Sequence, residues 1–157
     1  MSAFFLSASV PHGGRERAHE PADPDLIQRA VRELVFTMID RKRIVWGGHP
    51  TITPMMWTIC KELGATYAES VVLYQSRFFE GHFPEDNKHF PNVVYVDAVP
   101  GDREASLLRM REAMLAREDL TAAAFIGGME GVDAEFALFR RFHPRVTEFD
   151  GQLPDRN

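Results

Sequence analysis

Five short, almost continuously apolar runs alternate with helical patterns along the chain, and this alternation limits the fold more than any other feature. Strands that are apolar throughout are buried on both faces, whereas strands with one solvated face alternate apolar and polar residues. Buried strands separated by helices form parallel sheets, so the pattern predicts an α/β fold: a three-layer sandwich with a mainly parallel, five-stranded sheet. The runs are AFFLSAS (3–9), RIVWGG (43–48), SVVLYQS (70–76), NVVYVDAV (92–99) and TAAAFIGG (121–128).

Four amphipathic segments lie between these runs. They cover residues 24–40, 52–63, 102–117 and 130–142. The first has apolar residues at i, i+3, i+4 and i+7, with Asp23 as its expected N-cap and Pro24 at its first position. Gly64 is expected to end the second segment, and Asp102 to cap the third. The expected buried residues of the third are Leu107, Leu108, Met110, Met114 and Leu115.

The segment 77–92 interrupts the alternation, because an irregular stretch rich in Gly, Pro and aromatic residues stands where a crossover helix is expected. Irregular loops of this length are uncommon in compact domains and are often functional. After Pro144 the sequence predicts at most one weak strand, Val146 to Phe149, in an otherwise mobile tail. We therefore expect one domain over residues 1–145 and a C-terminal tail over residues 146–157.

Composition narrows the possible partners. The 157 residues are 45% hydrophobic, enough for one domain with a sizeable core, and the net charge of -5 gives no general attraction for nucleic acid. No apolar run approaches the ~20 residues that span a bilayer, and the first ten residues do not resemble a signal peptide. The single Cys60 excludes an internal disulfide and fits a reducing cytoplasm, the expected location. We expect neither membrane nor nucleic acid as a partner.

Glycines and polar residues follow several of the runs, at the carboxyl ends of the expected strands, where open parallel sheets bind their ligands. The pairs Gly47–Gly48 and Gly127–Gly128 are typical of strand-to-helix turns that present backbone N–H groups to an anion, although they could equally serve only as tight turns. Neither pair fits the dinucleotide or P-loop motif. The ligand-binding residues expected at this rim are Ser7, Ser9, Gly47, Gly48, His49, Thr51, Gln75, Ser76, Gly127, Gly128, Met129, Glu130 and Gly131.

Two acids follow the second glycine pair. Glu135 lies about one helical turn after Gly131, so its carboxylate can face the rim, bond ribose hydroxyls and stabilise positive charge at an anomeric carbon. Glu130 stands in the turn itself. The alternative for both is a solvated acid favoured by the helix N-terminus.

Other side chains near the rim each have two interpretations. Arg109 or Arg111 could reach a phosphate from the third helix or remain in solvent. His49 could bind a ligand or pack against its neighbours, and Thr51 more often caps a helix than binds a ligand. Phe78 and Phe79 are the best aromatic candidates for stacking on a base. The histidines and acids of HFPEDNKHF do not have metal-site spacing, so we predict no metal and no cofactor.

The stretch GGMEGVDAE resembles the PGGxGTxxE signature of the Lonely Guy (LOG) proteins, which belong to the SLOG superfamily of Rossmann-like nucleotide-binding domains. The surrounding blocks are similar to a bacterial SLOG branch from conflict and signalling systems, over residues 3 to about 144. The resemblance implies a Rossmann-like fold and a nucleotide or nucleotide-derived ligand. It also implies a homo-oligomer, and output could pass through an effector protein.

The catalytic residues of LOG proteins map onto Glu135 and Arg111. LOG enzymes release the base from nucleoside 5'-monophosphates. This chain departs from the signature, since Ile126 replaces the proline, one residue is added before Gly131, and Val132 replaces the threonine. The altered loop favours a ligand-sensing module over a phosphoribohydrolase, and an interaction module with a vestigial pocket is a third possibility.

Overall fold

The computed structural model describes residues 1–9, 23–127, 130–146 and 148–150, with the backbone alone for residues 130 and 148–150. In this part of the chain a six-stranded parallel sheet has the order β4-β3-β2-β1-β5-β6. Its strands are β1 (Ala3–Ala8), β2 (Arg43–Gly47), β3 (Val71–Ser76), β4 (Val93–Val96), β5 (Leu120–Ile126) and β6 (Glu148–Asp150). The α/β, parallel architecture predicted from the sequence is thus confirmed. The sixth strand, β6, pairs with β5.

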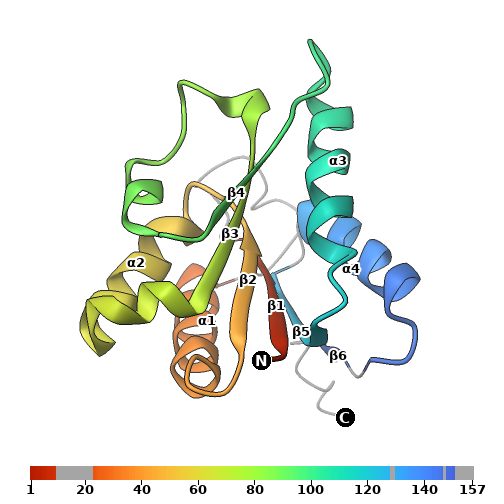
Figure 1. The fold of residues 1–157 in the computed structure, drawn as a ribbon. Coiled ribbons are helices and arrows are strands. Elements are labelled where there is room, and N and C mark those ends of the chain that lie inside the picture. Colours follow the sequence, from red (N-terminus) through yellow and green to blue (C-terminus); the bar gives the residue numbers. More distant parts are fainter. Residues whose placement is uncertain (10–22, 128–129, 147, 151–157) are drawn as a thin grey trace.

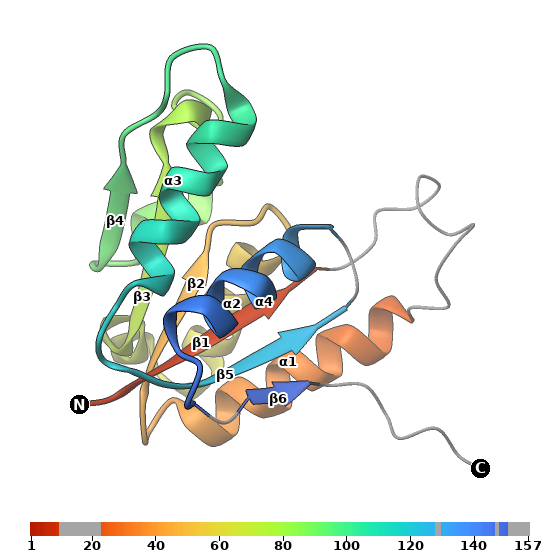
Figure 2. The same cartoon turned by 90° about the vertical axis from the view of Figure 1, so that its right-hand side faces the viewer.

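Four helices cover the two faces of this sheet (Figure 1). They are α1 (Pro24–Met38), α2 (Ile52–Leu63), α3 (Arg103–Leu115) and α4 (Glu130–Phe142). The helices α1 and α2 lie on one face, and α3 and α4 on the other, which Figure 2 shows towards the viewer. The strands run in one direction, so the loops that follow them gather at the upper edge in Figure 1.

Each face of the sheet has its own buried core. Side chains of β1, β2 and β3 point alternately to the two faces, so that Leu6 packs towards α1 and α2 while the neighbouring Phe5 packs towards α3 and α4. On the α3–α4 face, the rings of Phe5 and Phe125 meet edge to face with centroids 5.8 Å apart. Burial on both faces explains why the sequence runs are apolar throughout.

Local signals at the helix ends act as expected in three cases. Gly64 is the C-cap of α2, and its backbone N–H donates to Cys60 O at 2.9 Å. The Asp23 carboxylate accepts a hydrogen bond from the backbone N–H of Asp25 at 3.0 Å, and Asp102 accepts one from Ala105 at 2.9 Å. Thr51 is different, because it precedes α2 but makes no side-chain capping bond.

Three expectations about burial are wrong. Leu108 is 47% exposed, because α3 turns Met110, Met114 and Leu115 inward instead. Leu26, in the apolar stripe predicted for α1, is 53% exposed, because α1 turns Ile27, Val31 and Val35 inward instead. The run 92–99 forms the edge strand β4, whose Val94 and Tyr95 are more than a third exposed.

The irregular segment between β3 and β4 contains two short 3-10 helices, η2 (Arg77–Phe79) and η3 (Glu85–His89). It packs against α2: the ring of His89 stacks on Trp57 with centroids 4.2 Å apart. Phe90, just after η3, is buried against Trp46 of β2, with ring centroids 5.1 Å apart. A crossover helix is therefore replaced by a packed loop.

Candidate functional site

A cleft of about 820 Å³ opens at the carboxyl ends of β1, β2 and β3. Its walls come from β1 and the residue after it, the turn after β2, η2 and the loop that follows, α3, and the first turns of α4. Most of the residues predicted to bind a ligand line it: Ser7, Ser9, Gly47, Gly48, His49, Gln75, Gly131 and the two residues Arg111 and Glu135. The volume is in the range of small-molecule sites in proteins.

The strand order reverses between β1 and β5, which is where a ligand site is expected in an open α/β sheet. Ser9, just after β1, donates its backbone N–H to Ile126 O at 3.3 Å and so joins the two strand ends. Ser9 is 6% exposed and lines the cleft, and its hydroxyl oxygen has no hydrogen-bond partner among the described residues. A buried hydroxyl without a hydrogen-bond partner is an exception in proteins, so the Ser9 hydroxyl marks this junction as unusual.

Gly127 supports this junction without lining the cleft. Its φ of 97° lies in the region that favours glycine, and a Cβ there would approach Ser9 O to 2.8 Å. The glycine is therefore explained by the close passage of the β1 and β5 ends. Gly128, Met129 and the side chain of Glu130, also expected at the site, lie outside the described residues.

Arg111 of α3 and Glu135 of α4 meet inside the cleft. Arg111 Nε lies 3.6 Å from Glu135 Oε1, and the side chains are 16% and 14% exposed. Gly131 is beside this pair, because a Cβ there would lie 3.2 Å from Arg111 Nη2. A carboxylate and a glycine of α4 thus lie together with a guanidinium of α3, near the N-terminal end of α4.

Burial raises the pKa of the Glu135 carboxyl group, since the charged form loses its hydration. A hydrogen bond from Ser7 and the positive charge of Arg111 both act in the opposite direction and lower this pKa. Ser7 itself is only 2% exposed. The carboxylate is consequently oriented by two neighbours while one side of it remains in the cleft.

Gly47 and Gly48 line the cleft, but their geometry differs from an anion-binding turn. The backbone N–H of Gly48 donates to Tyr74 O at 2.7 Å, so it is already occupied. A Cβ on Gly48 would overlap the side-chain oxygen of Gln75, and a Cβ on Gly47 would lie 3.2 Å from the methyl group of Met110. These glycines make room for neighbouring side chains, and the role expected for the Gly48 amide as a phosphate donor is not supported.

His49 is held in a fixed orientation by Thr51. Nδ1 of the His49 ring accepts a hydrogen bond from the Thr51 backbone N–H at 3.2 Å and lies 2.7 Å from the Thr51 hydroxyl oxygen. In the neutral ring this places the proton on Nε2. The expectation that Thr51 acts as a capping residue is therefore wrong, and Thr51 contributes to the cleft only through His49.

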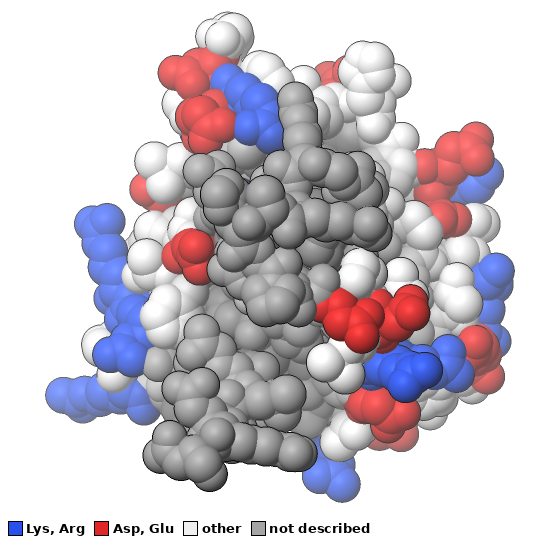
Figure 3. All heavy atoms as spheres, turned by 180° about the vertical axis from the view of Figure 1, so that it is seen from behind, with Lys and Arg blue, Asp and Glu red and all other residues white. Residues whose placement is uncertain are grey.

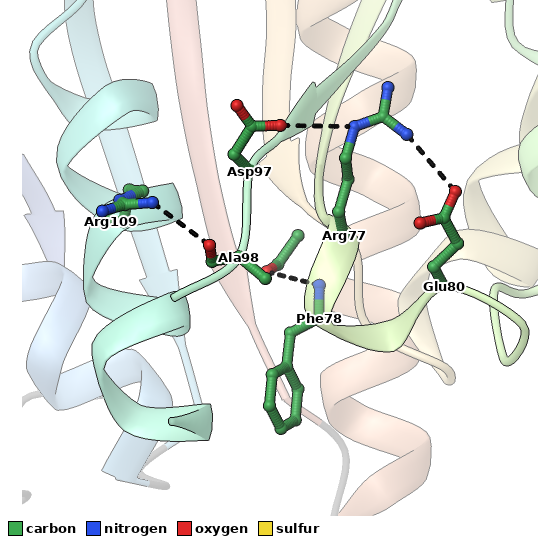
Figure 4. Close-up of polar contacts among 7 residues, drawn as sticks. Arg77, Phe78, Glu80, Asp97, Ala98 and Arg109 are labelled. Atoms are coloured by element: carbon green, nitrogen blue, oxygen red, sulfur yellow. Dashed lines mark hydrogen bonds and ion pairs between the residues drawn. The ribbon is translucent and has the colours of Figure 1, made fainter. Parts of the chain in front are cut away.

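Three other predicted residues, Ser76, Phe78 and Arg109, do not line the cleft. Ser76 is buried, and its hydroxyl accepts a hydrogen bond from the Phe78 backbone N–H at 3.2 Å to begin η2. The ring of Phe78 points away from the Arg77 side chain, which pairs with Glu80 and Asp97 (Figure 4). Arg109 donates to Ala98 O at 3.2 Å, on the outer side of α3 (Figure 4). Of the two helix arginines, Arg111 is the one in the cleft.

Sequence reasoning missed several residues of the cleft wall. They are His82, Pro84, Arg103, Glu104, Met110 and Asp133. His82 and Pro84 lie in the irregular segment, which the sequence had marked as functional without indicating which side chains turn inward. Phe79, one of the two aromatic residues expected to stack on a base, does line the cleft.

Charge on the described surface is mixed. Figure 3 shows Asp and Glu side chains beside Lys and Arg side chains over the right-hand half of the face it presents. No group of three or more His, Cys, Asp or Glu within the described residues could hold a metal ion. Among the same residues no helix is both long and apolar enough to span a membrane.

A parallel sheet with helices on both faces and a ligand-sized cleft where its strand order reverses defines a Rossmann-like domain. The sequence profile of the SLOG cluster3 family matches residues 17–149, and the chain belongs to this family. Membership confirms the resemblance to the SLOG superfamily and supports a nucleotide-related Rossmann-like domain. Searches of curated proteins and of solved structures gave no match.

Proposed function

We propose that the chain is a sensor module that binds a nucleotide or a nucleotide-derived small molecule in the cleft. The observation that carries this proposal is the meeting of Arg111 and Glu135 beside Gly131, at the start of α4. A helix N-terminus attracts phosphate, and an oriented carboxylate is a good acceptor for ribose hydroxyls. A phosphate at the first turn of α4 places the ribose near Glu135.

The other polar groups of the cleft suit the same ligand. The Ser9 hydroxyl, without a partner among the described residues, lies near the strand ends where a phosphate or ribose oxygen would be bound. Phe79 also lines the cleft and offers a ring to a base. Such a site combines polar groups for phosphate and ribose with an aromatic ring for a base.

Hydrolysis of the N-glycosidic bond is a second candidate, favoured by the fact that Glu135 and Arg111 share the cleft. In that reaction water adds to the anomeric carbon, the base leaves with a proton, and a carboxylate stabilises the positive charge that develops on the ribose. We favour binding because Val132 stands where the signature has a threonine hydroxyl and because the loop has one more residue.

One experiment separates the two functions. The chain is incubated with each common nucleoside 5'-monophosphate and with NAD, and followed by thermal unfolding and by chromatography for free base. A rise in Tm without base release supports the sensor, since a ligand of the folded state stabilises it by mass action. Base release that disappears in Glu135→Ala supports the hydrolase.

The control is Glu118→Gln, which removes one charge from an exposed residue between α3 and β5 that does not line the cleft. It should behave as the unchanged protein in both measurements. If neither stabilisation nor base release occurs, the cleft has no nucleotide function, and an interaction module with a vestigial pocket becomes the better description.

A sensor also needs an output, for which we propose self-association or contact with an effector protein. Leu26, Leu108 and Phe142 expose between 39% and 53% of their surface on three different helices. Light scattering with and without nucleotide tests whether binding changes the oligomeric state.

A further inference from the structure

Gln75 is a buried amide in the wall of the cleft. It is the penultimate residue of β3 and 4% exposed. A buried side-chain amide carries an acceptor and two donors that need partners, so its orientation determines what it offers to a ligand.

Asn87 of η3 fixes one end of this amide. Asn87 Nδ2 donates to Gln75 Oε1 at 3.2 Å, while Asn87 Oδ1 is buried without a partner among the described residues. If both amides were turned over, Gln75 Nε2 would donate to Asn87 Oδ1, and one hydrogen bond would remain. Asn87 Nδ2 would then be enclosed with two N–H groups that lack an acceptor. Because that costs more than one unmet acceptor, Gln75 Oε1 faces Asn87.

Gly48 packs against the same amide. The space of its missing side chain is filled by the Gln75 amide, which a Cβ on Gly48 would overlap. The position of Gly48 is in turn fixed by the bond from its N–H to Tyr74 O. The Gln75 side chain is therefore held by its contacts with Gly48 and Asn87.

The remaining polar atom of the amide is Gln75 Nε2. It has no hydrogen-bond partner among the described residues, yet it is not enclosed as Asn87 Oδ1 is. Since Gln75 lines the cleft, Nε2 is the atom it presents there, and it presents a donor. A donor fixed in this way selects an acceptor on the ligand.

The surroundings indicate which part of a ligand lies here. Phe79, His82 and Pro84 follow Gln75 in the chain and line the same cleft. Aromatic and apolar side chains beside one fixed donor form a typical site for a planar ring.

We propose that Gln75 Nε2 donates to the carbonyl group at C6 of a purine or C4 of a pyrimidine. The cleft then prefers oxo bases (hypoxanthine, guanine or uracil) to adenine and cytosine, which carry an amino group at that position. Asn87 is a positioning residue that sets the amide, and it need not touch the ligand. This inference rests on the proposed nucleotide-binding function, and it names the class of base.

The test uses matched pairs that exchange the carbonyl at C6 or C4 for an amino group, and with it the proton on the adjacent ring nitrogen. Dissociation constants are measured by calorimetry on the full chain for inosine and adenosine 5'-monophosphates, and for uridine and cytidine 5'-monophosphates. The oxo member of at least one pair should bind about tenfold more tightly, as expected where a buried donor is otherwise left unmet.

Two variants test the cause. In Asn87→Asp the introduced carboxylate accepts and does not donate, so the Gln75 amide turns over, presents Oε1 to the cleft and reverses the preference to the amino base. In Gln75→Leu no hydrogen bond is offered, and the preference disappears. The control is Asn92→Asp, an exposed residue whose Nδ2 donates to Glu69 O at 2.9 Å outside the cleft, and it should leave the preference unchanged.

The outcomes are separable. The inference is overturned if the two nucleotides of each pair bind with equal affinity, or if the amino member binds more tightly. In both cases the proposed function still stands. A preference that persists in Gln75→Leu also overturns it, and this holds even if Asn87→Asp does not fold. Absence of binding by all four nucleotides defeats the proposed function and this inference together.

Discussion

Arg111 Nε lies 3.6 Å from Glu135 Oε1, and this contact joins α3 to α4 at the wall of the cleft. Both side chains are more than four-fifths buried, so each charge loses most of its hydration on folding. Such a pair stabilises a protein little as a whole, but removing one partner leaves the other charge buried without compensation. The pair can therefore be tested for its structural and its functional role separately.

Arg111→Met should lower the free energy of unfolding by about 2–3 kcal/mol at neutral pH, somewhat less than the loss for a fully enclosed pair. The double variant Arg111→Met with Glu135→Leu should recover to within about 1 kcal/mol of the unchanged protein, yet bind no nucleotide. Urea unfolding and calorimetry measure the two effects. Arg109→Met is the control, since Arg109 is exposed. If Arg111→Met were as stable as Arg109→Met, the charges of Arg111 and Glu135 would not be coupled.

The stability of the chain should depend on pH through Glu135. Its folded pKa is raised by burial, so protonation favours the folded state. This contribution is complete below the pKa that Glu135 has in the unfolded chain, and is lost as the pH rises through the raised folded pKa. Glu135→Gln does not titrate, and its stability relative to the unchanged protein should increase across that window and then level off.

Urea unfolding at intervals from acid to neutral pH measures this difference, which amounts to about 1.4 kcal/mol for each pKa unit between the folded and unfolded states. Glu118→Gln supplies the baseline for an exposed acid. A difference between Glu135→Gln and the unchanged protein that stays constant with pH would mean that the Glu135 pKa is the same in both states.

Gly127 and Gly131 should respond differently to the same substitution. Gly127→Ala puts a side chain at φ 97° and 2.8 Å from Ser9 O, so we expect a loss of about 1–3 kcal/mol. Gly131→Ala meets only the end of the flexible Arg111 side chain at 3.2 Å, and should change stability by less than about 1 kcal/mol while weakening nucleotide binding. Thermal unfolding with and without nucleotide compares them. Equal losses of stability would contradict the assignment of Gly131 to the ligand site.

The sequence could predict the strands and most of the cleft because both follow from local rules. Continuous apolar runs separated by amphipathic segments specify a parallel sheet, and the carboxyl ends of parallel strands lie together. Ser7, Gln75 and Glu135 were therefore expected near one another before their contacts were known. Capping by Asp23 and Asp102 is equally local, since each side chain bonds a backbone group within three residues.

What could not be predicted depends on contacts between distant segments. No sequence pattern links Gln75 to Asn87, which lies in an irregular segment where the chain direction follows no period. Gly48 was given an anion-binding role because its neighbour Gln75 could not be seen to fill its space. Helical periodicity also leaves the flanks of an apolar stripe ambiguous, which is why Leu108 was expected to be buried and is not.

Ser9 gives the clearest separation of ligand binding from folding. Its hydroxyl oxygen is buried and has no hydrogen-bond partner among the described residues, a situation that costs about 1–3 kcal/mol for a polar group. Ser9→Ala removes the unmet group, so the ligand-free protein should keep its stability or gain about 1 kcal/mol, while the rise in Tm caused by nucleotide should shrink. Ser76→Ala is the matched control, because the Ser76 hydroxyl already accepts a bond from Phe78 and its loss should cost about 1 kcal/mol without altering the nucleotide effect. If Ser9→Ala instead destabilised the ligand-free protein as much as Ser76→Ala, the Ser9 hydroxyl would belong to the fold and not to the ligand.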